Sequence, residues 1–170
     1  MIGSPTRTEA AEYYYTYIDK AQTDDILGHL ETQSSELLAY LSTIGEERSL
    51  YRYQPGKWSF REALNHINDT ERVFSCRALW IARGAEAPLP GFDQDLFAAN
   101  ANADAVTWAA HIEEFRAIRA ATMHLLHSFT PEAWSRAGIA GNNPITTRAL
   151  AFIIAGHVEH HRRIFVVRYQ

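Results

Sequence analysis

Three histidines in this chain have the side-chain type and the spacing needed to hold a metal ion. Two of them lie in the run Ile154-Ala155-Gly156-His157-Val158-Glu159-His160-His161, and the third, His66, lies far upstream. Residues four apart share one face of a helix, so His157 and His161 would direct their imidazoles toward a common point. Two neutral imidazoles form half of a transition-metal site, and a third from another helix would make a facial trio of ligands. A pair at this spacing also arises by chance, so the metal hypothesis depends on the position of His66.

Apolar neighbours at helical spacing place all three histidines on the core side of a helix. A single inward histidine is more often a hydrogen-bonded core residue than a ligand. Three of them without partners would be costly, because buried polar groups need hydrogen-bond partners. One metal ion would remove that cost for all three. The residues sharing these faces are Ala63, Thr70, Val73 and Phe74 for His66, Leu150, Ile153 and Ile154 for His157, and Ile164 and Phe165 for His161.

The other histidines fit a metal site less well. His160, three residues after His157, could reach the same side of the helix, but the four-residue spacing favours His161. His111, His124 and His127 lie on or near another helix without a comparable pattern. We interpret these three as solvated or hydrogen-bonded imidazoles.

The composition indicates one globular domain over residues 1–170. Hydrophobic residues make up 46% of the 170 residues, enough for a core without disulfides. The formal net charge of −4 gives no broad attraction for nucleic acid. Cys76 is the single cysteine, so no internal disulfide can form and nothing indicates an oxidising compartment.

Neither export nor membrane insertion is expected. The N-terminal residues 1–8 lack the apolar segment of a secretory signal. The longest apolar runs are far shorter than the ~20 residues that a membrane helix needs. We therefore expect a cytoplasmic protein that does not bind membranes.

Helical signals dominate the chain. The second long helix has the clearest ends, because Ser59 and Glu62 form a Ser-x-x-Glu capping box and Gly84 suits a left-handed C′ position. No segment shows sustained two-residue alternation, so no sheet is expected, and residues 138–144 are interpreted as a turn. The expected elements are a tyrosine-rich docked segment over 1–22 and helices from Asp24 or Asp25 to Ile44, from Ser59 to Arg83, from Asp104 or Thr107 through Leu126, from Thr130 through Trp134, and from Thr146 or Thr147 to Val167.

These elements predict an all-α fold, a four-helix bundle with one long crossover connection. The connection spans residues 85–105 and contains Pro88-Leu89-Pro90-Gly91-Phe92. Connections of this length are usually functional or carry structure of their own. Metal and ligand sites in such bundles form between facing helices, where His66 would face His157 and His161.

Three stretches of the chain carry the pattern of one known family. They are Gly56-Lys57-Trp58-Ser59-Phe60-Arg61-Glu62-Ala63-Leu64-Asn65-His66-Ile67-Asn68-Asp69-Thr70-Glu71-Arg72, then residues 82–93, and Thr147-Arg148-Ala149-Leu150 through His161. With them the chain resembles the DinB-like (YfiT-like) metal-binding bundles over most of Tyr13 to Tyr169. The resemblance implies three ligands, one on the second helix and two spaced by four on the last, which fall on His66, His157 and His161. It also implies a homodimer, and some relatives resemble S-transferases that use bacillithiol, mycothiol or glutathione.

A three-histidine site would leave at least one coordination position for water or substrate, as in catalytic zinc sites. The metal could then lower the pKa of a water or a thiol. We expect a divalent transition metal, zinc or nickel, with iron and manganese as alternatives, and a low-molecular-weight thiol as a possible second cofactor. Asp69 and Thr70, one turn beyond His66, are placed to meet bound solvent. Asp69 is a candidate general base, or equally a positioning partner or a surface carboxylate.

Further residues are candidates for the walls of a substrate pocket. Trp58 and Phe92 could line it, and Arg77 could attract an anionic substrate or thiol, with a salt bridge inside the bundle as the alternative. Cys76 is interpreted as a buried small residue, because nothing beside it in sequence would lower the pKa of its thiol. Glu159 is expected to point away from the face shared by the ligands, so it is not assigned the role of a base.

Three functions remain open from the sequence. The first is a metal-dependent enzyme acting on a small molecule, with transfer of a thiol to an electrophile preferred. The second is a metal-dependent hydrolase of a small amide or ester, with Asp69 as the base. The third is a non-catalytic, stress-related bundle in which the metal is structural.

Overall fold

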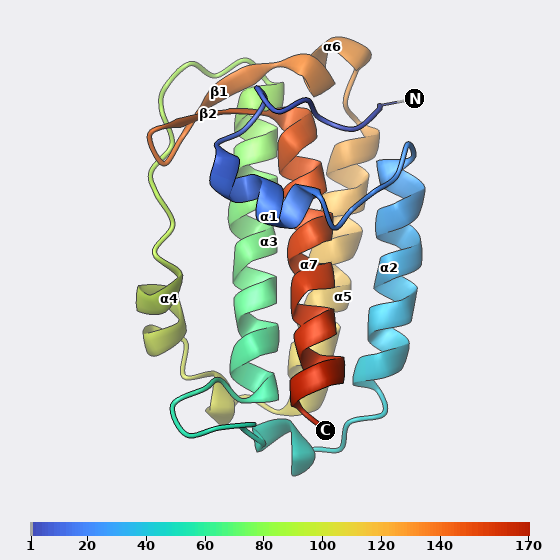
Figure 1. The fold of residues 1–170 in the computed structure, drawn as a ribbon, viewed down its shortest axis with the longest axis vertical. Helices are drawn as coiled ribbons and strands as arrows, with labels where there is room; N and C mark the ends of the chain where they lie inside the picture. Colours follow the sequence, from blue (N-terminus) through green and yellow to red (C-terminus); the bar gives the residue numbers. More distant parts are fainter. Residues whose placement is uncertain (1) are drawn as a thin grey trace.

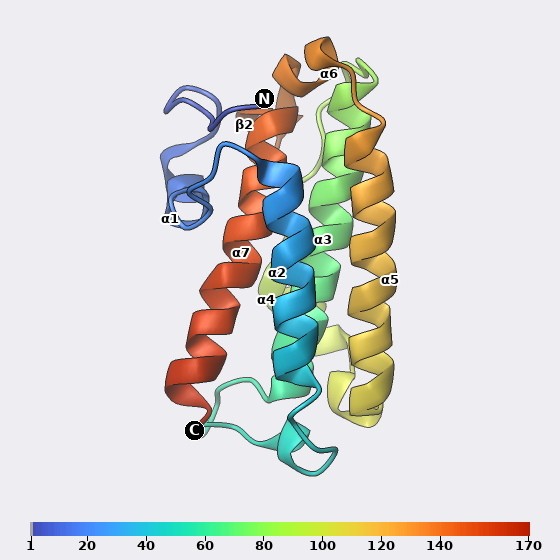
Figure 2. The ribbon, with the colours of Figure 1, turned by 90° about the vertical axis from the view of Figure 1, so that its right-hand side faces the viewer.

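Four long helices form an all-α bundle, as the sequence predicts (Figures 1 and 2). The computed structural model describes residues 2–170. α3 packs against both α7 and α5, and α2 packs against the same two helices from the other side. The four helices are α2 (Ile26–Leu41), α3 (Phe60–Ala82), α5 (Trp108–His127) and α7 (Thr147–Arg168).

A crossover makes α3 and α5 run in the same direction. Both helices begin at the end of the bundle where the C-terminus lies, and the chain between them returns along the outside of α3 (Figure 1). The connection has structure of its own, because it contains α4 (Gln94–Asn100), which contacts α3, and a 3₁₀ helix (Ala103–Ala105). α4 is thereby held beside the middle of α3.

Side-chain caps begin the helices close to where the sequence places them. In α3 the capping box is complete, since Ser59 accepts from the Glu62 backbone and Glu62 accepts from the Ser59 backbone. After this helix, Gly84 adopts a φ of 77°, which favours glycine. The N-cap residues are Asp25 for α2, Ser59 for α3, Thr107 for α5, Thr130 for α6 (Pro131–Ser135) and Thr146 for α7.

The expectation that the chain contains no strand is wrong. Residues 137–146 form an antiparallel hairpin of β1 (Ala137–Ala140) and β2 (Asn143–Thr146), which joins α6 to α7. Gly141 and Asn142 make the turn with φ values of 58° and 65°, a conformation that these two residue types tolerate. Strands of four residues are too short to show sustained alternation, so only the Gly-Asn pair signals the hairpin.

The N-terminal segment packs against the bundle through α1 (Tyr15–Ile18), which contacts α7. The segment also includes a 3₁₀ helix (Glu12–Tyr14), and α1 lies on the outer side of α7 (Figure 2). The close approach depends on Gly156, because a Cβ atom at this position would overlap the backbone carbonyl of Tyr17. The packing brings the Tyr17 side chain beside the histidines of α7.

A buried polar layer separates two hydrophobic clusters inside the bundle. Arg119 of α5 donates to both carboxylate oxygens of Glu71 on α3, each at 2.8 Å, and to the Leu30 carbonyl of α2 at 3.0 Å. Gln33 of α2 donates to the Ala155 carbonyl of α7 at 2.9 Å. The layer therefore ties all four helices together at the level of the histidines of α7.

Cys76 is exposed, contrary to the expectation that it is buried. It lies in a shallow groove between α3 and α5, together with Leu79 and Ile118. Helical geometry turns it away from the interior, because ten residues at 100° each place Cys76 about 80° from His66 around the helix axis.

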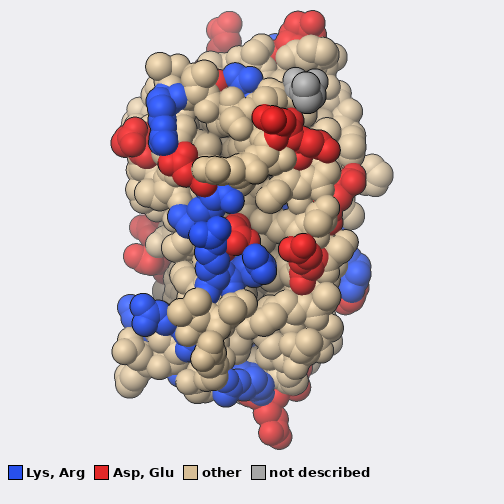
Figure 3. All heavy atoms as spheres, turned by 45° about the vertical axis from the view of Figure 1, so that its right-hand side comes forward, with Lys and Arg blue, Asp and Glu red and all other residues tan. Residues whose placement is uncertain are grey.

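The surface carries charges of both signs. On the face drawn in Figure 3, acidic and basic side chains are interspersed rather than gathered into one wide basic field. On α7, Glu159 accepts hydrogen bonds from Arg162 at 2.8 Å and from Arg163 at 2.7 Å. Within residues 2–170, none of the helices combines the length and apolar character required to cross a membrane.

Candidate metal centre

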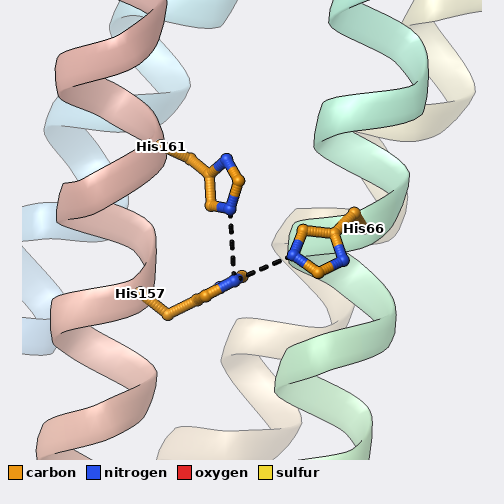
Figure 4. A group of neighbouring side chains, drawn as sticks. All are labelled: His66, His157 and His161. Carbon is orange, nitrogen blue, oxygen red and sulfur yellow. Dashed lines mark hydrogen bonds between the residues drawn. The ribbon is translucent and has the colours of Figure 1, made fainter. Parts of the chain in front are cut away.

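His66 of α3 meets His157 and His161 of α7 in the space between the two helices (Figure 4). The Nε2 atom of His157 lies 3.0 Å from that of His66 and 3.2 Å from that of His161. All three candidate ligand atoms lie within 4.8 Å of one another, and all three residues are buried. At Zn–N distances of about 2.0–2.1 Å, nitrogen ligands in a tetrahedral arrangement stand about 3.4 Å apart. The spacing of the rings therefore suits a shared ion.

Hydrogen bonds among the three rings cannot satisfy all of these nitrogens. An imidazole nitrogen carries either one proton or one lone pair, whereas Nε2 of His157 faces two other Nε2 atoms. It can pair well with one of them, and the second contact is then left unmatched. A cation that accepts a lone pair from each ring fits this set of donors.

Burial favours the neutral form of all three imidazoles. Desolvation, with a smaller contribution from His160, lowers the pKa of His66 to about 4. Desolvation also lowers the pKa of His157 and of His161 well below the usual range, and charge repulsion from the neighbouring histidines adds to it. Neutral imidazole is the form that binds a metal.

Aromatic rings surround the three histidines. The ring centroids of Trp58 and His66 are 4.8 Å apart, and Phe92 stacks parallel to His66 at 6.5 Å. From α1, the ring of Tyr17 lies 5.3 Å from that of His157. These rings limit the access of water to the centre.

Two cavities reach the histidines from different sides. We name the first, of about 260 Å³, the Arg77 cavity, and the second, of about 330 Å³, the Trp58 cavity. His66, Tyr17 and Gln94 line both cavities. The other lining residues are Tyr13, Tyr14, Thr70, Phe74, Arg77, Gly91, Phe92, Gly141, Ile153 and His157 for the Arg77 cavity, and Tyr53, Gly56, Lys57, Trp58, Ala63, Asp95, His160, His161, Ile164 and Tyr169 for the Trp58 cavity.

The structure brings the three pocket candidates Trp58, Arg77 and Phe92 to these cavities, but not Asp69. The Asp69 carboxylate accepts from Asn65 at 2.9 Å and pairs with Arg72 at 3.4 Å. Burial raises its pKa, yet its oxygens are directed away from the histidines toward this polar group. A role for Asp69 as the general base therefore has no geometric support.

Thr70, one position further along α3, does lie beside the histidines. It lines the Arg77 cavity, and its Oγ1 atom is buried without a hydrogen-bond partner among residues 2–170. A buried hydroxyl without a partner is costly, so Thr70 places an unsatisfied polar group beside the histidines.

His160 is separate from the group of three. Its ring lies 5.0 Å from that of His161 and 5.6 Å from that of Tyr17, on the side of the Trp58 cavity. His111 is buried near the start of α5, and its Nε2 lies 2.9 Å from the Ala103 carbonyl. His124 and His127 are exposed, as expected.

Sequence reasoning missed the contribution of Tyr17 and Gln94, which both line the two cavities. A usable signal for Tyr17 was Gly156, since an isolated glycine inside an apolar helix often marks a close backbone approach. Gln94 carries no such signal, because the path of the crossover decides its place.

Together, the bundle and its trio of buried histidines define a class of helical proteins with a candidate metal site between two helices. The sequence model of the DinB superfamily matches residues 29–165, and the chain belongs to this superfamily. YfiT from Bacillus subtilis, described as a probable metal-dependent hydrolase with an unusual four-helix bundle topology, has a similar fold. It matches with a TM-score of 0.65 and 15% sequence identity over 92% of this chain and 86% of that one. The search of curated proteins returned no match.

Proposed function

We propose that the protein is a metal-dependent enzyme that uses His66, His157 and His161 as the ligands of one divalent cation. The observation that carries this proposal is the meeting of three buried Nε2 atoms from two helices, in a geometry that hydrogen bonds alone cannot satisfy. The YfiT-like fold adds support, since YfiT is described as metal-dependent. Zinc or nickel is our proposed metal, with iron or manganese as alternatives, because imidazole suits each of them.

A cation held by three imidazoles would acidify a water or a thiol at its open position. The residues of the chain would do the remaining work. Phe92 and Trp58 shield the centre from bulk water, and Tyr17 covers it from α1. Thr70 forms part of the wall of the Arg77 cavity beside the histidines.

The reaction we propose is transfer of a small thiol to an electrophile. Two cavities that share His66 give each of two reactants its own approach to one centre. With a thiol acidified by the cation, this reaction needs no carboxylate base. Among the described residues, the three histidines are the only group of potential metal ligands that lie close enough together to hold one ion. No carboxylate is part of this group.

Hydrolysis of a small amide or ester is the second candidate. Asp95 lines the Trp58 cavity together with His161 and is the carboxylate best placed to accept a proton from water there. The description of YfiT as a probable hydrolase also favours this reaction. A cytoplasmic homodimer remains our expectation for the assembled protein.

The metal proposal is tested by elemental analysis of protein purified without an affinity tag. We expect about one transition-metal ion per chain, and a loss of most of it in His66→Ala, His157→Ala and His161→Ala. His124→Ala is the matched control, because His124 is exposed on α5. Stoichiometric metal in two of the three ligand variants would contradict the assignment.

The reaction is tested with 1-chloro-2,4-dinitrobenzene and 4-nitrophenyl acetate, each with and without a low-molecular-weight thiol. Turnover of the aryl chloride that requires both thiol and metal supports transfer. Turnover of the ester without thiol supports hydrolysis instead. Metal-loaded protein that turns over neither substrate would favour the non-catalytic bundle.

A further inference from the structure

Arg77 stands apart from the other buried arginines of the protein. Arg61 pairs with Glu46, and Arg119 pairs with Glu71, whereas Arg77 has no carboxylate partner among residues 2–170. Its side chain is 4% exposed. Burying a cation without a counter-charge is costly, so a negatively charged ligand beside Arg77 would offset that cost.

The guanidinium group of Arg77 is held in place but not saturated. One nitrogen donates to the Pro90 carbonyl at 2.8 Å, and the guanidinium carbon lies 4.9 Å from the centroid of the Phe74 ring. Among residues 2–170, no partner is found for its other nitrogens, and none of them is fully buried. These N–H groups therefore remain available to a molecule in the cavity.

Arg77 and the histidines belong to the same cavity. Eleven residues at 100° each place Arg77 about 20° from His66 around the axis of α3, and Thr70 lies between them along that face. The rise of 1.5 Å per residue separates the two Cα atoms by about 16 Å along the helix. The cavity between these two ends is lined by Phe74, Phe92 and Ile153, and Arg77 is the one charged residue among those that line it.

We propose that Arg77 binds the carboxylate of a small substrate whose apolar body lies along the cavity and whose reacting group is at the histidines. The inference rests on the proposed function for the reacting end, but the recognition of the anion depends on Arg77 alone. A planar guanidinium with free N–H groups matches the geometry of a carboxylate. The cavity volume of about 260 Å³ restricts the ligand to a small molecule.

The test compares the binding of 3-phenylpropanoate with that of its uncharged amide by titration calorimetry. Wild-type protein is expected to bind the carboxylate at least tenfold more tightly than the amide. Arg77→Gln should remove this preference, and Arg77→Lys should keep a reduced one. Arg83→Gln is the matched control, because Arg83 lies at the exposed end of the same helix.

Each measurement is made on metal-loaded and on chelator-treated protein. A preference that survives metal removal but not Arg77→Gln supports the inference, even if elemental analysis finds no metal and the proposed function fails. A preference that disappears with the metal, or that persists in Arg77→Gln, overturns it, as does equal binding of both probes by the wild-type protein.

A second readout keeps the inference testable if Arg77→Gln does not fold. The Arg77 Nε–H resonance, assigned in wild-type protein by its absence from the spectrum of Arg77→Lys, should shift on addition of the carboxylate. The amide should leave this resonance in place. An unchanged Arg77 resonance at a saturating concentration of the carboxylate would overturn the inference.

Discussion

The Nε2 atoms of His66 and His157 lie 3.0 Å apart, although the two residues belong to different helices. The contact is set by the packing of α3 against α7 and by the polar layer that joins all four helices. Ligands held this close before binding require little rearrangement to receive a cation. The packing of the scaffold therefore holds the three rings close together.

The stability of the chelator-treated protein should fall on acidification. The pKa of His66 is about 4 in the folded protein, below the usual value of 6.5, so the unfolded chain takes up a proton first as the pH falls. The stabilisation is complete above pH 6.5 and is lost progressively toward pH 4. His66 alone should cost about 2 kcal/mol at pH 5.

Urea unfolding at pH 7 and at pH 5 measures this effect. His66→Gln, which cannot titrate in this range, should lose less stability between the two pH values than the wild-type protein. His124→Gln serves as the exposed control and should behave as wild type. An identical loss in His66→Gln and wild type would refute the attribution to His66.

Replacement of Thr70 by valine should separate stability from activity. The substitution keeps the shape of the side chain and removes a buried hydroxyl that has no partner within residues 2–170. The free energy of unfolding should therefore rise by about 1 kcal/mol. Metal-dependent turnover should fall, since Thr70 lines the Arg77 cavity beside the histidines. Thermal unfolding and initial rates of the same preparation give both quantities.

Thr122→Val is the matched control for this prediction. Thr122 also carries a buried hydroxyl with no partner among the residues that the structure describes, but it lies on α5 in the groove beside Cys76. The Thr122→Val variant should be more stable than the wild-type protein and should keep the wild-type turnover. Full activity in Thr70→Val would show that its hydroxyl takes no part in the reaction.

Replacement of Gly156 by alanine should displace α1. The added Cβ would overlap the Tyr17 carbonyl, and overpacking of this kind costs about 1–3 kcal/mol. Limited proteolysis should then cut within residues 2–22 faster than in the wild-type protein. Gly45→Ala is the control, because a Cβ at that position meets no atom within 4 Å. Equal cleavage rates in both variants would rule out the proposed contact.

Removal of one partner from the buried Arg119–Glu71 pair should destabilise the bundle strongly. Arg119→Met leaves the carboxylate of Glu71 buried and unpaired, at an expected cost of about 3–5 kcal/mol. Adding Glu71→Leu to the same chain should recover much of that loss. Arg72→Met, which breaks the partly exposed pairs with Asp69 and with Glu114 of α5, should cost about 1 kcal/mol or less. Chemical unfolding of the four proteins decides between these outcomes, and a small loss in Arg119→Met would contradict the prediction.

Local signals were sufficient to predict the helices and the faces of the histidines. The capping box at Ser59 and the glycine at position 84 mark the ends of α3, and the spacing of apolar residues turns His66 inward. The sequence also predicts that His66 meets His157 and His161, because a four-helix bundle offers few arrangements in which the inward faces of two helices meet.

Other parts of the site depend on long-range packing that spacing does not encode. Asp69 and Thr70 are neighbours in sequence, yet only Thr70 lines the Arg77 cavity. The Asp69 carboxylate accepts hydrogen bonds from Asn65 and Arg72 instead. The positions of Tyr17 and Gln94 depend on how α1 and the crossover dock. Such docking is decided by tertiary contacts rather than by local preference.

Tyr17 comes from residues that precede the stretch matched by the DinB superfamily, whereas all three histidines lie within that stretch. The three histidines and the tyrosine that packs over them therefore belong to separate segments of the chain. Changes within residues 2–28 would therefore alter the surroundings of the proposed metal centre while leaving its three proposed ligands unchanged.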